Sequence, residues 1–271
     1  MTALNYETIR IDREGPVDWL VLNRPEALNA INTQMVTDLR DYLGGLLENT
    51  DTRVVVMRGE GRAFCAGLDI KQANKMVDSS GHRPVGRGFG FQGYLAEVYL
   101  LMRRCPQPII SLIHGPACGG GFAFALASDI RIAAQSMRMN AAFIRIGLTA
   151  CDMGTSYLLP RLVGTALASE LMLTGRFIEA ERALSAGLVS EVVPDAELLS
   201  AAKPYLEEML TTSPMGLRLT KEGLNMAIDA NSLEAAMAIE NRNQILCSQT
   251  EDAKEGMRAF IEKRAPVYSG K

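Results

Sequence analysis

The 271-residue chain has few of the residues that metal sites and disulfide frameworks require. It contains two histidines and five cysteines, and the cysteines are widely spaced and form no CxxC pair. A disulfide framework or zinc knuckle is therefore not expected, and a reducing compartment is the simpler interpretation. With only His82 and His114 and no HExxH pattern, we predict no metal site. Positive charge is also not in excess: the net charge of −3 argues against nucleic acid as a partner.

Signals for secretion and for a membrane are lacking as well. The first fifteen residues have no basic stretch followed by an apolar one, so we expect no signal peptide. Residues 105–128 carry no charged side chain and are long enough to span a bilayer. Their three prolines and four glycines would break a lipid-exposed helix, so we predict a buried strand, a turn and a buried helix. We expect a cytoplasmic protein with no membrane partner.

The composition and the hydrophobic pattern predict an α/β fold. Hydrophobic residues make up 48% of the chain and charged residues 22%, which is typical of a globular protein and argues against disorder. A helix is expected from Asn32 and Thr33 to about Glu48. Short apolar runs predict an N-terminal hairpin and further strands between helical stretches, at residues 6–12, 17–22, 54–57, 108–113 and 129–133.

The second half of the chain changes in character. Beyond about residue 153 the pattern is mostly helical, and Val192 and Val193 are the last convincing strand residues. We therefore divide the chain into a mixed core, residues 1–200, and a helical C-terminal unit, residues 201–271. Residues 76–93 are rich in glycine and serine and predict a surface loop of the kind that often covers a ligand site.

Three glycine-containing segments are candidates for ligand binding. Residues 88–93 match GxGxxG but do not follow a strand, so a dinucleotide site is not favoured. Residues 115–121 (GPACGGG) follow a strand and precede an apolar helix, where free backbone N–H groups could hold a phosphate or an oxyanion. The alternative is that these glycines only let a buried helix pack tightly. Residues 62–69 form a second turn, and together the two turns offer the two N–H donors that an oxyanion hole needs.

Four motifs in this order resemble the enoyl-CoA hydratase/isomerase (crotonase) superfamily: NRPEALNA at 23–30, FCAGLD at 64–69, HGPACGGG at 114–121 and EGMRAFIEKR at 255–264. The resemblance covers nearly the whole chain. It implies a crotonase-like spiral of ββα units, a helical C-terminal trimerisation region, and a homotrimer or homohexamer. It also implies an acyl-CoA thioester as substrate, with coenzyme A entering as part of that substrate and no separate cofactor.

The resemblance also implies roles for individual residues. The N–H groups of Leu68 and Gly120 match the family's oxyanion hole. Asp152, within GLTACDMGT at 147–155, matches an aspartate that faces the substrate in dienoyl-CoA isomerases and in a dehalogenase relative. The alternative for Asp152 is a cap on a helix beginning near Met153. Contacts with CoA are implied for Ala27, Leu28, Ala66, Asp69, Phe260 and Lys263, the last two in part from a neighbouring subunit.

Two departures from the family pattern bear on the reaction. Ala123 and Phe143 occupy the positions that resemble those of the two hydratase glutamates, which position and activate water. We therefore expect double-bond isomerisation through an enolate, with Asp152 moving the proton. Hydration, hydrolysis or ring opening with atypical residues remains an alternative, as does a non-catalytic acyl-CoA-binding or RNA-binding relative. The acidic balance argues against RNA. We interpret His114 as a structural hydrogen-bonding residue.

Overall fold

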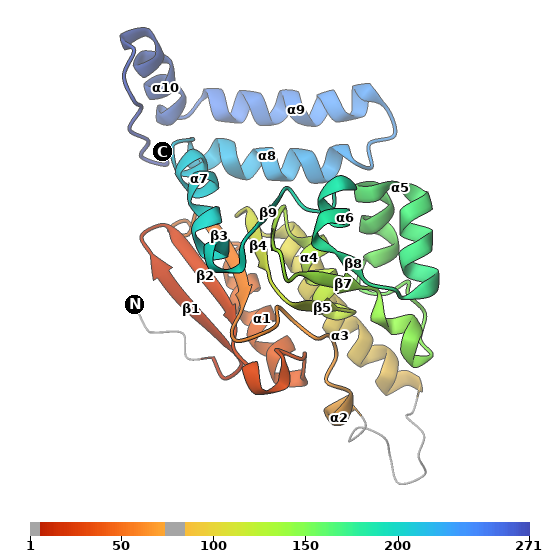
Figure 1. Ribbon diagram of the computed structural model, residues 1–271. Coiled ribbons are helices and arrows are strands. Elements are labelled where there is room, and N and C mark those ends of the chain that lie inside the picture. Colours follow the sequence, from red (N-terminus) through yellow and green to blue (C-terminus); the bar gives the residue numbers. More distant parts are fainter. Residues whose placement is uncertain (1–5, 74–84) are drawn as a thin grey trace.

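A six-stranded sheet forms the centre of the protein in the computed structural model, which describes residues 6–73 and 85–271 (Figure 1). The strand order is β1-β2-β3-β4-β6-β9. The first two strands pair as the expected antiparallel hairpin, and the others are parallel to their neighbours. Their bounds are β1 Ile9–Glu14, β2 Val17–Leu22, β3 Val54–Gly59, β4 Ile109–Ile113, β6 Ile130–Ala134 and β9 Glu191–Val193.

Successive residues of β3 face two different cores, as the twofold repeat of a strand requires. Val55 and Met57 belong to the larger core, which is built with α1 (Thr33–Gly45), α3 (Val85–Arg104) and α4 (Gly120–Ala127). Val54 and Val56 belong to the smaller core, which α7 (Leu198–Leu210) covers. Burial on both faces explains why the strands are nearly continuous apolar runs.

A second, three-stranded sheet was not expected from the sequence. It consists of β5 (Pro116–Cys118), β7 (Arg138–Asn140) and β8 (Ile178–Glu179), in the order β5-β7-β8. Each strand has at most three residues, which is too short for an alternating pattern to stand out. This sheet matters for the site because β5 leads directly into the glycines that precede α4.

The expected loop over residues 76–93 is wrong from residue 85 onward. Residues 74–84 lie outside the described part of the chain, whereas α3 begins at Val85 and contains all of the GxGxxG segment. Each helical glycine costs about 1 kcal/mol relative to alanine, which is why local propensity favoured a loop. Burial of the following turns outweighs this cost, since Leu95, Val98 and Met102 lie fully inside the larger core.

The beginning of α1 follows a local sequence signal. The Asn32 side chain accepts a hydrogen bond from Met35 N at 2.8 Å, which confirms the predicted beginning of α1. The helix α5 (Thr155–Thr174) is kinked at Gly164, whose φ is 77°. The remaining short helices are η1 Pro25–Ala27, α2 Ile70–Ala73, η3 Ala142–Ile146, α6 Ala180–Ser185 and η4 Asp195–Glu197.

The C-terminal part is helical, as expected, with α8 (Pro214–Ala227) and α9 (Leu233–Ser248) side by side and α10 (Glu251–Glu262) at their end (Figure 1). Buried Lys221 of α8 holds it to the sheet, with Nζ 2.8 Å from Asp129 Oδ2 and 2.9 Å from the Met102 carbonyl oxygen. The division at residue 200 stays a prediction, and it falls within α7, which packs on the sheet. Over the described residues, no helix has the length and apolar character needed to cross a bilayer.

Candidate functional site

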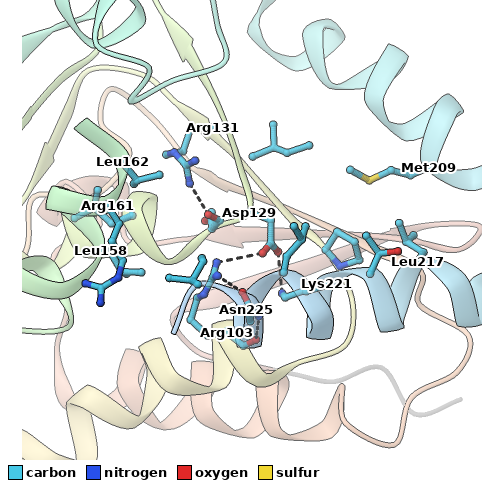
Figure 2. A pocket seen from close by; sticks show the side chains of 17 residues that line it. Arg103, Asp129, Arg131, Leu158, Arg161, Leu162, Met209, Leu217, Lys221 and Asn225 are labelled. Atoms are coloured by element: carbon cyan, nitrogen blue, oxygen red, sulfur yellow. Dashed lines mark hydrogen bonds and ion pairs between the residues drawn. The ribbon is translucent and has the colours of Figure 1, made fainter. Parts of the chain in front are cut away.

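A cavity of about 600 Å³ lies between α3, α5 and α8 (Figure 2). Its charged side chains already bind protein groups. Asp129 pairs with Lys221 and with Arg103, whose Nη1 lies 3.2 Å from Asp129 Oδ1, while Arg131 donates to the Leu188 carbonyl oxygen at 2.8 Å. Because these bonds hold the helices to the sheet, we assign the charges a structural role and place the functional site elsewhere.

Another cavity, of about 240 Å³, contains several of the residues that the sequence predicted for the site. It brings together the 66–68 turn, the glycine turn before α4, η3 and Asp152. Asp152 and Gln92 are the polar side chains of its lining, which is otherwise apolar or glycine. The lining residues are Ala66, Gly67, Leu68, Ile70, Gly88, Phe91, Gln92, Leu95, Gly119, Ala142, Phe143, Ile146, Leu148, Asp152 and Met153.

The two glycine turns, about fifty residues apart in the chain, are in direct contact. Cys118 N donates to the Cys65 carbonyl oxygen at 2.9 Å, and Cys65 N donates to the Pro116 carbonyl oxygen at 3.2 Å. Gly67 has a φ of +90°, and a β-carbon there would lie 2.6 Å from the Cys118 carbonyl oxygen and 3.6 Å from Gly120 N. Glycine is thus required at this approach both by its backbone conformation and by the lack of space.

The N–H groups of Leu68 and Gly120 are available where these turns meet. Neither has an acceptor among the described residues, whereas the neighbouring Asp69 N donates to the Ile31 carbonyl oxygen at 2.9 Å and Gly119 N to the Asn140 carbonyl oxygen at 2.9 Å. Gly120 is also the first residue of α4, so the positive end of that helix lies at the same place. This arrangement can receive a negatively charged oxygen.

Asp152 lies on the cavity wall, and its carboxylate does not cap α5. The helix begins at Thr155 with Gly154 as its N-cap residue, so the capping interpretation is wrong. Instead, Asp152 Oδ1 accepts hydrogen bonds from Met153 N, at 2.8 Å, and from Gln92 Nε2 of α3. Burial raises the pKa of Asp152 above its ordinary value, while these two hydrogen bonds lower it and offset part of the rise.

The two positions that depart from the hydratase pattern have different surroundings. Ala123 is fully buried within α4 and does not line the described cavity. Phe143 lines the cavity, and a β-carbon on Gly119 would lie 3.4 Å from Phe143 Cε1, so the ring packs against the glycine turn. An aromatic ring therefore stands beside the free N–H groups at the position where the resemblance places a hydratase carboxylate.

The 24–30 segment is bound to the Leu68 turn. Ala66 N donates to the Leu28 carbonyl oxygen at 2.9 Å, and Leu28 ends η1 with a φ of 53°. Arg24 Nη2 forms a largely buried ion pair with Asp69 Oδ2 at 3.1 Å, and the same guanidinium donates to the Ala30 carbonyl oxygen. The structure thus places Leu28, Ala66 and Asp69 together beside the cavity, with Ala27 next to Leu28 in η1.

Phe260 and Lys263 are not part of this cluster. Phe260 is 85% exposed on α10, and Lys263 ends that helix with a φ of 56°. Figure 1 shows α10 at the opposite end of the molecule from α2 and the beginning of α3, where the cavity lies. Neither side chain lines the described cavity.

Sequence reasoning missed Gln92 and Tyr99, both on α3. Gln92 contacts Asp152, and Tyr99 Oη donates to the Gly120 carbonyl oxygen at 3.1 Å. Gln92 lies in the segment expected to be a loop, and a helical assignment starting at residue 85 is the only signal that could have placed it on the cavity wall. His114 Nε2 hydrogen-bonds the Gly61 carbonyl oxygen at 2.8 Å, which confirms its structural role.

Cysteine, histidine and acidic side chains do not gather into a metal-binding group of three or more anywhere in the two described ranges. The groups in the cavity that can bind a ligand are backbone N–H groups, one carboxylate, one amide and apolar side chains. Such a set suits a ligand with a polarised carbonyl group and an apolar body.

Comparison with known proteins shows which family and fold this chain is similar to. The family model described as enoyl-CoA hydratase/isomerase matches residues 12–271. A Mycobacterium tuberculosis protein named "Probable enoyl-CoA hydratase EchA12" is 40% identical over 251 residues, 92% of this chain and 88% of its own. The "1,2-epoxyphenylacetyl-CoA isomerase" of Escherichia coli is 35% identical over 95% of this chain and 97% of its own. A crystal structure of enoyl-CoA hydratase from Bacillus anthracis, 32% identical, has a TM-score of 0.90 over 98% of this chain and all of its own, which confirms the crotonase fold.

Proposed function

Because the chain belongs to the enoyl-CoA hydratase/isomerase family, we propose that it acts on an acyl-CoA thioester and moves a carbon–carbon double bond through an enolate. The observation that carries this proposal is the position of Asp152. It places the single carboxylate of the described cavity lining in the cavity that Gly67, Leu68 and Gly119 also line, where the two glycine turns meet. A carboxylate beside an oxyanion site is the minimum needed to remove and return a proton next to a carbonyl group.

The thioester carbonyl oxygen would accept hydrogen bonds from Leu68 N–H and Gly120 N–H. As a proton leaves the neighbouring carbon, negative charge develops on that oxygen, and each fixed donor in a dry site stabilises the transition state by about 3–4 kcal/mol. Asp152 takes the proton from one carbon and returns it to another carbon of the same acyl group. The double bond then moves, and no water is gained or lost.

Hydration is the competing function, since several relatives are named as hydratases. The resemblance assigns two glutamates to that reaction, and alanine and phenylalanine occupy their positions here. Over the described lining, Asp152 is the single carboxylate, and Phe143 adds an apolar ring where water would need a polar partner. A relative from Escherichia coli is named as an isomerase of an epoxide, so reactions other than hydration also occur among proteins of this similarity.

The rest of the thioester would extend from the cavity toward η1. Ala27, Leu28, Ala66 and Asp69 would contact the CoA part, because they lie together beside the turn that carries Leu68 N–H. Phe260 and Lys263 would reach CoA from a second copy within a homotrimer or homohexamer. Exposed apolar side chains on the C-terminal helices support such an assembly, with Leu233 75%, Phe260 85% and Ile261 79% exposed.

Mass spectrometry in deuterated water tests the reaction directly. The purified protein is incubated with a 2-enoyl-CoA and, separately, with a 3-enoyl-CoA. We expect deuterium incorporation with double-bond migration and no gain of water. Asp152→Asn should abolish exchange while retaining CoA binding, and Asp12→Asn, at an exposed aspartate, is the matched control. Clean addition of water to the 2-enoyl-CoA, with no migration, would contradict the proposal.

A further inference from the structure

Two hydrogen bonds from different parts of the chain end on the same oxygen of Asp152. Met153 N donates to Oδ1 at 2.8 Å, and Gln92 Nε2, sixty residues away in the sequence, also donates to Oδ1. No donor of the described residues contacts Oδ2. Since hydrogen bonds to an oxygen engage its lone pairs, Oδ1 is the weaker proton acceptor and Oδ2 keeps its lone pairs free.

Gln92 is well placed to hold the carboxylate because α3 is anchored next to it. Tyr94 Oη lies 3.0 Å from Thr37 Oγ1 of α1, and the Arg40 guanidinium lies over the Tyr94 ring at 3.9 Å from its centroid. Leu95 is buried in the larger core. A donor on a rigid helix limits the motion of its acceptor more than a donor on a free loop would.

Gln92 is also one of only two described groups that favour the charged form of Asp152. No lysine or arginine of the described residues forms an ion pair with Asp152. The pKa of Tyr99 is raised mainly by burial, and also by the charges of Cys65 and Asp152. Burial raises the pKa of Asp152, and the Met153 and Gln92 hydrogen bonds lower it. Asp152 is the single titratable side chain of the described cavity lining.

We propose that Gln92 is the positioning residue of the Asp152 carboxylate, which it orients through Oδ1 so that Oδ2 exchanges the proton with the substrate. This inference rests on the proposed function and deepens it. Gln92 acts through Asp152, so its loss should lower kcat more than it raises KM. Loss of the amide donor should also raise the pKa of Asp152. Because the base works in its ionised form, the acid limb of the profile of rate against pH should move to higher pH.

Gln92→Leu and Gln92→Glu test this role, with Gln34→Leu as the matched control. Gln34 Nε2 donates to Asp38 Oδ1 at 2.8 Å on α1, so the control removes a hydrogen bond of the same kind away from the cavity. For Gln92→Leu we expect kcat to fall about tenfold and the acid limb to rise by about one pH unit. Gln92→Glu should raise the limb further, because two neighbouring carboxyl groups share a proton. Gln34→Leu should change neither quantity.

A second measurement follows the Asp152 carboxyl without turnover. NMR of protein with isotope-labelled aspartate, with the Asp152→Asn spectrum to identify the signal, should show a higher pKa for Asp152 in Gln92→Leu than in the wild type. An unchanged pKa and an unchanged kcat profile would overturn the positioning role. The pKa of Asp152 could instead be higher in Gln92→Leu while the wild-type protein exchanges no proton with any enoyl-CoA. That result would support the Gln92–Asp152 hydrogen bond and refute the proposed function.

Discussion

Gly121 packs directly on the backbone of Cys65: a β-carbon at Gly121 would lie 2.1 Å from the Cys65 carbonyl oxygen and 2.7 Å from its Cβ. The residue before it, Gly120, has a free N–H at the same junction. The glycine run therefore packs tightly and also leaves an N–H group free, so the two interpretations that the sequence left open do not exclude each other. Gly121 lets the turns approach, and that approach sets Gly120 N–H near the Leu68 turn.

Gly121→Ala should destabilise the protein. The added methyl group meets backbone atoms that cannot rotate away, so the two turns must separate, and we expect a loss of about 3 kcal/mol in the free energy of unfolding. Urea unfolding measures this change. Gly44→Ala is the matched control, because that helical glycine has nothing within 4 Å of the added carbon, and alanine there should be neutral or stabilising. Equal stability of the two variants would show that the contact is not required.

Arg24→Met should loosen the turn that carries Leu68. The Arg24 and Asp69 side chains are only 13% and 12% exposed, so removal of the cation leaves a largely buried carboxylate, and a loss of about 3 kcal/mol in unfolding free energy is expected. The deuterium-exchange activity should also fall, because the turn no longer holds Leu68 N–H in place. Arg10→Met serves as the control, since its ion pair with Asp12 is exposed and should contribute less than about 1 kcal/mol.

Asp152→Asn should slightly stabilise the protein at neutral pH while abolishing its activity. The pKa of Asp152 is raised in the folded state, so its contribution to stability is full below the ordinary aspartate pKa and declines as pH rises through the raised value. The asparagine side chain of the variant does not ionise, so the variant does not lose this stability as pH rises. Because Asp152 is only partly buried, the gain should stay below about 1 kcal/mol. Urea unfolding measures the gain in unfolding free energy at two pH values, one near neutral and one below the ordinary aspartate pKa. A gain at both pH values would show that the raised pKa of Asp152 is not its cause.

Ala123→Glu should not restore hydration. Ala123 has no exposed surface and lies inside α4 between packed side chains, so a carboxylate there would be buried without a partner. We expect a loss of at least about 2 kcal/mol in unfolding free energy and no addition of water to a 2-enoyl-CoA in the mass-spectrometric assay. Ala166→Glu, at an exposed position of α5, provides a comparison for the added charge alone. Measurable hydration by Ala123→Glu would show that one glutamate is enough in this cavity.

Several elements could be predicted because their signals are local. The alternation in β1 and β2, the apolar runs of β3, β4 and β6, and the Asn32 cap each depend on residues within one element. The segment from Val85 to Gly93 could not be predicted in the same way. Its glycines favour a loop locally, and only burial of the later turns of α3 makes the helix the more stable state.

The sequence by itself determined the family, the strands of the six-stranded sheet and the two glycine turns, because motifs and hydrophobic repeats are properties of neighbouring residues. Only the tertiary structure decided which distant residues meet: Gly120 beside the Leu68 turn, Gln92 on Asp152, and Phe260 away from the cavity of its own chain. The physical reason is that such contacts depend on how the sheet and helices pack in three dimensions. Hydrophobic pattern specifies which face of an element is buried, but not which polar group lies opposite it.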